Sequence, residues 1–328
     1  MSGNARWGYR LKLGMAQLAP GQLSESELLK WLGARQWEAI AEQLGVPSGE
    51  LRSAEGERLY ASFLTVDWVA PPGAGLESYG EDQTLVVDHQ VSSYGRRFVE
   101  GVMQLSAEGK MELDEAGPHA TVTLINGLVA REGNNQRLKI REPAGDTAIG
   151  GRLSGMPPLL REHAEVQRSG WPSRGEEGVA FGPEQHYTWP IVLESDLNGA
   201  GLLYFARYVT ITDWATRMHL LSNAGAPMSS GLAACLVTER RRIHYYANAE
   251  AHDSVLAVVR AARSPAAPGD SGDSGREARV RLFFEVDLYR AGDRCLLASA
   301  AVTRRLLVPR LDSGLVAETS RLLRRWGA

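Results

Sequence analysis

The sequence predicts an α+β protein with two similar halves, in each of which an antiparallel sheet wraps around one long helix. Two observations predict this class. A strongly helical segment at residues 24–44 is followed by several strand-like segments, and no helices alternate with them, which disfavours a parallel α/β fold. The same order of elements returns after residue 184. A long helix and a curved sheet can bury their apolar sides against each other.

The helix at residues 24–44 has the clearest boundaries of the predicted elements. Its apolar residues recur at helical spacing, as expected for a mostly buried helix. Ser24 and Glu27 form a capping box at the start, and Gly45 with Pro47 marks the end. We expect antiparallel strands after it at residues 59–69, 84–92, 97–105 and 121–131.

The second half repeats this plan after a polar connecting region. The composition predicts a linker at 141–183, with one short helix from Pro158 to Gln167, between domains at 1–140 and 184–328. The elements expected after the linker are a strand at 186–193, a helix at 204–221, and strands at 242–251, 254–262, 280–289 and 295–307.

The composition is that of an ordinary globular protein. Of 328 residues, 44% are hydrophobic and 23% are charged, which excludes disordered, collagen-like and coiled-coil classes. Cys235 and Cys295 lack metal-ligand spacing and are too few for a disulfide framework, so we expect a reducing, cytoplasmic location. No segment resembles a signal peptide or a membrane-spanning run, so no membrane partner is expected. A Ser-, Gly- and Pro-rich tract at 264–275 is expected to be a mobile spacer.

Charge is distributed unevenly along the chain. The net charge is −3, but residues 240–328 carry 16 Lys+Arg against 10 Asp+Glu, which favours an anionic partner for this segment. The segment has no nucleic-acid recognition motif and no series of stacking aromatic residues. We therefore do not expect nucleic acid to be that partner.

The most specific local motif is Glu194-Ser-Asp-Leu-Asn-Gly-Ala-Gly-Leu-Leu-Tyr-Phe-Ala-Arg-Tyr208. A glycine turn that runs into a helix presents backbone N–H groups and the positive end of the helix dipole, which can stabilise an oxyanion formed from a thioester. The alternative is that Asp196 and Asn198 only form the turn and cap the helix. The candidate substrate-binding residues in this motif are Asp196, Asn198, Gly199, Gly201 and Tyr204.

This motif resembles the start of the central helix in the hot-dog fold of acyl-CoA thioesterases and dehydratases. The order of elements agrees with that fold over the whole second half. The resemblance implies that the turn binds a thioester. The matching positions are Asp196, Asn198, Gly201, Tyr204 and Tyr208.

A second motif, Leu18-Ala-Pro-Gly-Gln-Leu-Ser-Glu25, precedes the first helix. Together with the motif at 196–206 it resembles the leinamycin-type bifunctional acyltransferase/decarboxylase family of polyketide biosynthesis, in order through most of the chain. The resemblance implies a double hot-dog fold that converts methylmalonyl-CoA to propionyl-acyl carrier protein with loss of carbon dioxide. It implies no cofactor beyond the CoA thioester as substrate and the carrier protein's phosphopantetheine as acceptor. A homodimer is a further expectation.

In that family the nucleophile is a tyrosine on the strand after the first helix, and the corresponding position here is Tyr60. A phenol is a poor nucleophile at neutral pH, so it needs a neighbour that favours its ionised form. The start of the first helix would supply one if Tyr60 pointed at it, and its N–H groups are a second candidate thioester site. The alternative is a packed aromatic side chain. The residues at that start are Gly21, Gln22, Leu23 and Ser24.

Arginines and histidines complete the set of candidates. We expect Arg240, Arg241 and Arg242 to contact phosphates of CoA or of the carrier protein, with an ordinary solvated face as the alternative. His89 stands beside Asp88, but neighbours on a strand point to opposite faces and cannot pair. No catalytic role is expected for His119, His186, His244 or His252.

Two other functions fit the same residues. In a hot-dog thioesterase, Asp196 would position a water molecule on the thioester, and no carrier protein would be needed. A non-catalytic module would bind acyl-CoA without turnover. We therefore expect an enzyme that acts on an acyl thioester, with acyl transfer and decarboxylation as the leading hypothesis.

Overall fold

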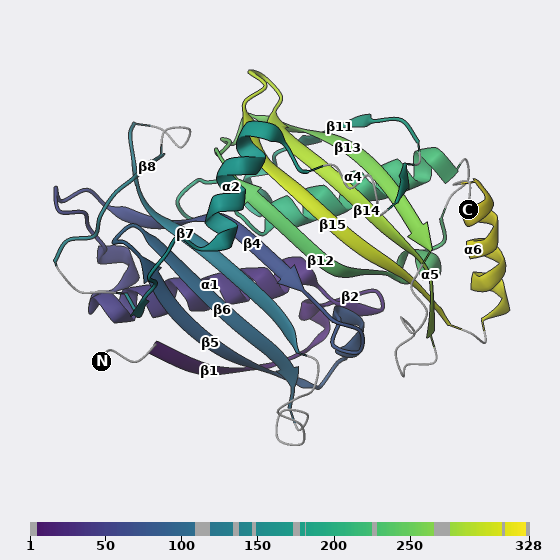
Figure 1. The fold of residues 1–328 in the computed structure, drawn as a ribbon, viewed down its shortest axis with the longest axis horizontal. Helices are drawn as coiled ribbons and strands as arrows, with labels where there is room; N and C mark the ends of the chain where they lie inside the picture. The colour runs from purple at the N-terminus through teal and green to yellow at the C-terminus, as the bar shows by residue number, and fades with distance from the viewer. Residues whose placement is uncertain are drawn as a thin grey trace.

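The computed structural model describes residues 5–108, 119–133, 138–145, 149–172, 178–180, 182–224, 228–265, 276–309 and 312–325. Most of the predicted spacer tract, residues 266–275, lies outside them. The described residues form two halves with the same order of main elements, which is a strand, a long helix and four further strands (Figure 1).

The first half is built around helix α1. The side-chain oxygen of Ser24 accepts a hydrogen bond from the N–H of Glu27 at 3.4 Å, which confirms the predicted cap. Gly45 ends the helix at φ 69°, in the left-handed region that favours glycine. The elements are β1 (Ala5–Lys12), β2 (Leu18–Ala19), β3 (Gln22–Leu23), α1 (Glu25–Leu44), β4 (Leu59–Val69), β5 (Thr84–Tyr94), β6 (Phe98–Ala107), β7 (Ala120–Arg131), β8 (Leu138–Ile140) and β9 (Gly151–Arg152).

The second half is built around helix α4. Helix α2 of the connecting region agrees with the short helix predicted there. The elements are α2 (Pro158–Ser169), β10 (Val179–Ala180), β11 (Gln185–Pro190), α3 (Leu193–Asp196), α4 (Arg207–Ala224), α5 (Ser230–Ala233), β12 (Leu236–Tyr245), β13 (Ser254–Pro265), β14 (Arg276–Arg290), β15 (Leu296–Pro309) and α6 (Ser313–Arg325).

The two wrapped sheets expected from the sequence are joined edge to edge into one continuous sheet. Its strand order is β1-β5-β6-β7-β4-β12-β15-β14-β13-β10, and β11 also pairs with β13. The halves meet where β4 pairs with β12, from Thr65 opposite His244 to Val69 opposite Arg240. The strand that follows the long helix in each half therefore lies at the middle of the sheet.

The helices lie on both faces of this sheet. Helices α1 and α4 cover one face, and α2 crosses the opposite face over the boundary between β4 and β12 (Figure 1). Where α1 approaches the start of α4, the rings of Phe63 and Phe205 stack with centroids 3.7 Å apart. Gly33 permits this approach, because a Cβ at that position would lie 2.5 Å from the Phe205 ring. The predicted α+β class is confirmed.

One strand lies earlier in the chain than expected. Strand β12 spans Leu236–Tyr245, whereas the sequence predicts a strand at 242–251. The prediction was wrong because three consecutive arginines are typical of a solvated segment, yet in the structure they lie inside the strand and pair with carboxylates. Helix α6 was not predicted either. The predicted domain limits at 140 and 184 remain predictions.

Candidate functional site

A cavity of about 550 Å³ lies where the two halves separate. The pairing of β4 with β12 ends at Thr65 and His244, and the preceding residues of β4 pair only with β7. A register shift between Phe63 and Thr65 marks this point in β4. The cavity walls come from the middle of α1, the first part of β4, α2, the segment before α4 and the segment after β12.

Three predicted site residues from distant parts of the chain line this cavity. Tyr60 comes from β4, whereas Asn198 and Tyr204 come from the motif before α4. The sequence places them in separate halves, and the joined sheet brings them together. Gly199 and Gly201 belong to the same turn but do not line the cavity.

Hydrogen bonds to Asn198 fix the turn before α4. Its side-chain oxygen accepts from the N–H of Ala200 at 3.0 Å and from the N–H of Leu202 at 3.1 Å. Gly201 has φ 73°, a conformation that favours glycine. Arg131 of β7 donates to the carbonyl of Ala200, so the turn is also tied to the first half. These bonds hold the residues from Leu202 onward at the cavity wall.

The start of α4 offers donors beside the cavity. The N–H of Tyr204 is used, since it donates to the carbonyl of Asp196 at 2.8 Å. Within the described part of the chain, no group accepts a hydrogen bond from the N–H of Phe205 or Ala206. Phe205 lines the cavity, whereas Ala206 does not. The positive end of the α4 dipole and the N–H of Phe205 therefore lie next to Tyr60's cavity.

Asp196 has a structural role in this arrangement. Its side chain is fully buried and accepts hydrogen bonds from Trp189, Arg207 and the N–H of Val192 at 2.7–3.0 Å. Burial raises the pKa of Asp196, but the hydrogen bonds, first that from Trp189, outweigh it and hold the pKa below its usual range. Asp196 does not line the cavity. The role of positioning a water molecule there, expected in the thioesterase alternative, is therefore wrong for Asp196.

The surroundings of Tyr60 are cationic. The guanidinium carbons of Arg58 and Arg131 lie 5.1 Å and 5.7 Å from the centre of its ring. None of the described lining residues is an aspartate or a glutamate. The cavity therefore suits a substrate that carries a negative charge.

Two lining residues were missed by the sequence analysis. His163 of α2 contacts the carbonyl of Tyr245 through Nε2 at 2.9 Å, and its ring lies 4.8 Å from that of Tyr246. Burial lowers the pKa of His163 and raises that of Tyr246, so both are neutral at pH 7. Neither residue belongs to a motif. His163 lies in α2, within the predicted linker, and Tyr246 directly follows β12, the strand whose position was predicted wrongly.

The start of α1 does not face Tyr60, contrary to expectation. The residues of α1 that line the cavity are Gly33, Ala34 and Trp37, in the middle of the helix. At a rise of 1.5 Å per residue they lie about 13 Å or more from the cap at Ser24. The predicted oxyanion residues instead pack near β12: Gly21 approaches Ala234, and Gln22 donates to the carbonyl of Leu236 at 3.4 Å. None of Gly21, Gln22, Leu23 and Ser24 lines the cavity.

The three arginines of β12 are engaged in ion pairs within the protein. Arg241 is fully buried between the two long helices, where it pairs with Glu25 of α1 and Asp213 of α4, both at 2.5 Å. It cannot reach a CoA phosphate, so that prediction is wrong for Arg241. Arg240 and Arg242 lie on the opposite face of the strand and share Asp67.

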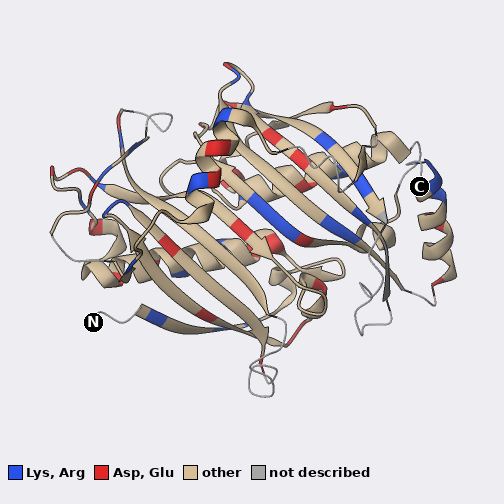
Figure 2. Cartoon of the chain, in the orientation of Figure 1, with Lys and Arg blue, Asp and Glu red and all other residues tan. Residues whose placement is uncertain are grey.

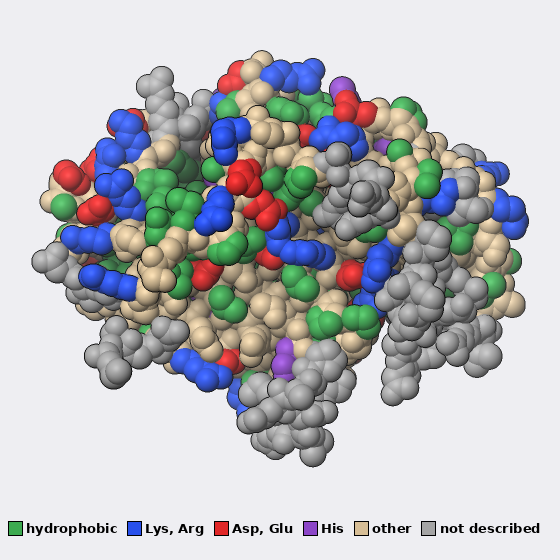
Figure 3. All heavy atoms as spheres, in the orientation of Figure 1, with side chains coloured by type: hydrophobic (Ala, Val, Ile, Leu, Met, Phe, Trp, Pro, Cys, Tyr) green, Lys and Arg blue, Asp and Glu red, His purple; other side chains and the backbone are tan. Residues whose placement is uncertain are grey.

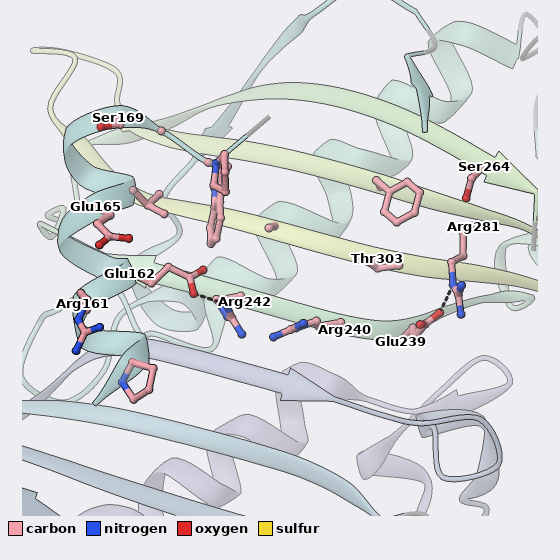
Figure 4. Close-up of a pocket in the computed structure, with 17 residues that line it drawn as sticks. Arg161, Glu162, Glu165, Ser169, Glu239, Arg240, Arg242, Ser264, Arg281 and Thr303 are labelled. Carbon is pink, nitrogen blue, oxygen red and sulfur yellow. Dashed lines mark hydrogen bonds and ion pairs between the residues drawn. The ribbon is translucent and has the colours of Figure 1, made fainter. Parts of the chain in front are cut away.

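On that outer face, Arg240 and Arg242 line an open groove beside α2 rather than the Tyr60 cavity (Figure 4). Arg242 also pairs with Glu162 of α2, and Glu239 binds Arg281. Figure 2 shows the basic segment of β12 next to acidic ones, and Figure 3 shows positive and negative side chains interspersed over this face. The groove is therefore close to electrically balanced, and phosphate binding by Arg240 and Arg242 remains a prediction.

The histidines of the sheet are structural. His89 is fully buried and its Nε2 contacts the side chain of Gln36 at 2.7 Å, whereas Asp88 pairs with Arg6, which confirms that the neighbours face opposite sides. His244 is also fully buried, at the junction of β4 and β12 and one residue before the end of β12. Its Nδ1 lies 3.0 Å from the hydroxyl of Thr65.

The described residues contain no group of three or more His, Cys, Asp and Glu side chains arranged to hold a metal ion. None of their helices combines the length and the apolar character needed to cross a membrane.

Comparison with known proteins identifies the fold. Three solved structures align with nearly the whole chain. A Lactobacillus plantarum protein with the provisional name oleoyl thioesterase has a TM-score of 0.60 and 8% identity, over 94% of this chain and 98% of that chain. For the 12:0-ACP thioesterase of Umbellularia californica the TM-score is 0.53 with 10% identity, over 92% and 94%. An acyl-ACP thioesterase of Bacteroides thetaiotaomicron has a TM-score of 0.51 and 13% identity, over 91% and 97%.

The chain has a double hot-dog fold. No protein-family model matches it, and no curated protein does. At such low identities the double hot-dog likeness concerns the fold alone and carries no activity over to this chain.

Proposed function

We propose that this double hot-dog protein is an acyltransferase and decarboxylase that acts on methylmalonyl-CoA in the Tyr60 cavity. The acyl group would pass to Tyr60, lose carbon dioxide, and leave as a propionyl group on the thiol of an acyl carrier protein. The observation that carries this proposal is the composition of the cavity, which has a tyrosine hydroxyl beside a helix start and no described carboxylate in its lining.

The acyl-transfer steps use groups of suitable chemistry. The oxygen of Tyr60 would attack the thioester carbonyl, the carbon–sulfur bond would break, and the phenolic proton would end on the departing thiol. The product is an aryl ester. Because phenolate leaves more readily than an alkoxide, this ester remains reactive enough to give the acyl group to a second thiol, whose proton returns to Tyr60.

The decarboxylation step fits the electrostatics of the cavity. Breaking the bond to the carboxylate releases carbon dioxide and leaves an enolate, whose oxygen the N–H of Phe205 at the start of α4 would stabilise. A carboxylate in the lining would repel both the substrate's carboxylate and the enolate. The guanidinium groups of Arg58 and Arg131 attract them.

Hydrolysis of an acyl thioester is the second candidate. The three solved structures that share the fold favour this alternative, because each is named as a thioesterase. A hydrolase needs a base that activates water, and Asp196 is buried and fully engaged. Neutral His163 would be the base in that case. The hydrolase would release a free acid and would not need Tyr60 as an acyl acceptor.

A product assay separates these candidates. The protein is incubated with methylmalonyl-CoA in the presence and absence of acyl carrier protein, and products are identified by mass spectrometry. We expect propionyl-carrier protein from the wild type and at least a 100-fold loss in Tyr60→Phe, with unchanged activity in the control Tyr187→Phe, whose residue does not line the cavity. Free acid from both the wild type and Tyr60→Phe would support the hydrolase, and tight binding without turnover would support a binding module.

A further inference from the structure

The guanidinium group of Arg58 lies beside Tyr60 and has no anionic partner in the described structure. Arg58 is exposed and lines the cavity, and its guanidinium carbon is 5.1 Å from the centre of the Tyr60 ring. Within the described part of the chain, this guanidinium forms no ion pair and no hydrogen bond. It is therefore accessible to an anionic group of a ligand that reaches Tyr60.

Two neighbouring arginines are, by contrast, engaged within the protein. Arg141 pairs with Glu57, the residue before Arg58, at 2.8 Å. Arg131 donates to the carbonyl of Ala200. The carboxylate closest to Arg58 in the sequence is thus neutralised by another arginine, and Arg58 keeps its charge for a ligand.

The geometry of β4 places Arg58 and Tyr60 on the same face. Arg58 directly precedes the strand, and its backbone pairs with that of Arg52. Leu59, between the two, points the other way, since it belongs to a buried apolar cluster with Ile40 of α1. A ligand bound at the oxygen of Tyr60 therefore lies on the side to which Arg58 projects.

We propose that Arg58 binds the carboxylate of the substrate and so makes the cavity selective for acyl-CoA donors that carry one. The inference rests on the proposed function for the identity of the substrate. In methylmalonyl-CoA one carbon atom separates the carboxylate from the thioester carbonyl, whereas the whole pantetheine arm separates the CoA phosphates from it. When the carbonyl reaches Tyr60, the carboxylate is therefore the anion within reach of Arg58.

The chemistry of the pair explains the selectivity. A guanidinium binds a carboxylate through charge-assisted hydrogen bonds, and a propionyl thioester has no group that can form them. None of the described lining residues is an aspartate or a glutamate that could compete for Arg58. Hydrogen bonds to a charged group correspond to roughly a tenfold preference or more. The cavity would thus favour the acyl group that can lose carbon dioxide.

The test measures binding in Tyr60→Phe, which has no hydroxyl to receive the acyl group. Dissociation constants for methylmalonyl-CoA and propionyl-CoA are determined by calorimetry. We expect methylmalonyl-CoA to bind about tenfold more tightly. Adding Arg58→Gln should remove this difference by weakening methylmalonyl-CoA alone. The control is Arg52→Gln, which should preserve the difference, because Arg52 donates to the carbonyl of Leu51 and does not line the cavity.

Two results would overturn the inference. One is equal affinity of Tyr60→Phe for both thioesters. The other is an equal weakening of both by Arg58→Gln, which would mean that Arg58 meets a CoA phosphate or supports the fold. Thermal unfolding of Arg58→Gln should match that of its parent, because the described structure gives Arg58 no ion pair to lose.

The proposed function is tested separately, by the acyl adduct on Tyr60 in the wild-type protein. If the preference for the carboxylated thioester depends on Arg58 but no acyl group reaches Tyr60, the proposed function falls and the carboxylate site stands.

Discussion

At the scale of single residues, the partners of a polar group decide whether it is available for chemistry. Asp196 belongs to the most recognisable motif of the chain, yet its oxygens are fully engaged by Trp189, Val192 and Arg207. Tyr60 belongs to no sharp motif, yet it lines the cavity between the two halves. The residue types were readable from the sequence, but their hydrogen-bond partners come from segments far apart in the chain.

The structural role of Asp196 predicts a stability effect. Asp196→Asn removes the negative charge that pairs with the Arg207 guanidinium and should lower the free energy of unfolding by about 3 kcal/mol at pH 7, measured with denaturant. Because the folded state depresses the pKa of this carboxyl, its contribution is present above the unfolded-state value of about 3.9 and is lost as the pH falls through the folded value. The difference between the two proteins should therefore shrink in acid. Wild-type stability of the variant, combined with loss of activity, would restore Asp196 as a catalytic candidate.

At the scale of elements, strand β12 shows how tertiary structure overrides a local pattern. Successive side chains of a strand point to opposite faces, so Arg241 enters the space between α1 and α4 while Arg240 and Arg242 meet Asp67 on the outer face. The helix α1 and the strands after it were predictable from periodicity and turn residues. Strand β12 was not predictable in this way, because the carboxylates that neutralise its arginines come from four other elements, α1, α4, β4 and α2.

A pair of matched variants tests this description of β12. Arg241→Met leaves the carboxylate of Glu25 without its buried partner and that of Asp213 with Arg304 alone, so we expect a loss of about 3–5 kcal/mol in the free energy of unfolding. Arg240→Met, its neighbour on the exposed face, should cost less than about 1 kcal/mol. Equal effects of the two substitutions in urea denaturation would show that the faces are assigned incorrectly.

At the scale of the whole molecule, the two halves share one plan but differ at their helix starts. The start of α4 lies beside the Tyr60 cavity, whereas the first residue of α1, Glu25, is bound by the buried Arg241. The repeat of elements was predictable from the sequence. The difference between the two helix starts was not predictable. It depends on the antiparallel pairing of β4 with β12 and on the residues at which that pairing ends.

This difference predicts one acyl acceptor in each chain. The most direct measurement is the intact mass of the protein after exposure to methylmalonyl-CoA without carrier protein, followed by peptide mapping of any adduct. We expect one decarboxylated propionyl group per chain, located on Tyr60 and absent from Tyr60→Phe. Release of free acid without an adduct, or an acyl group on a residue outside the cavity, would contradict the account.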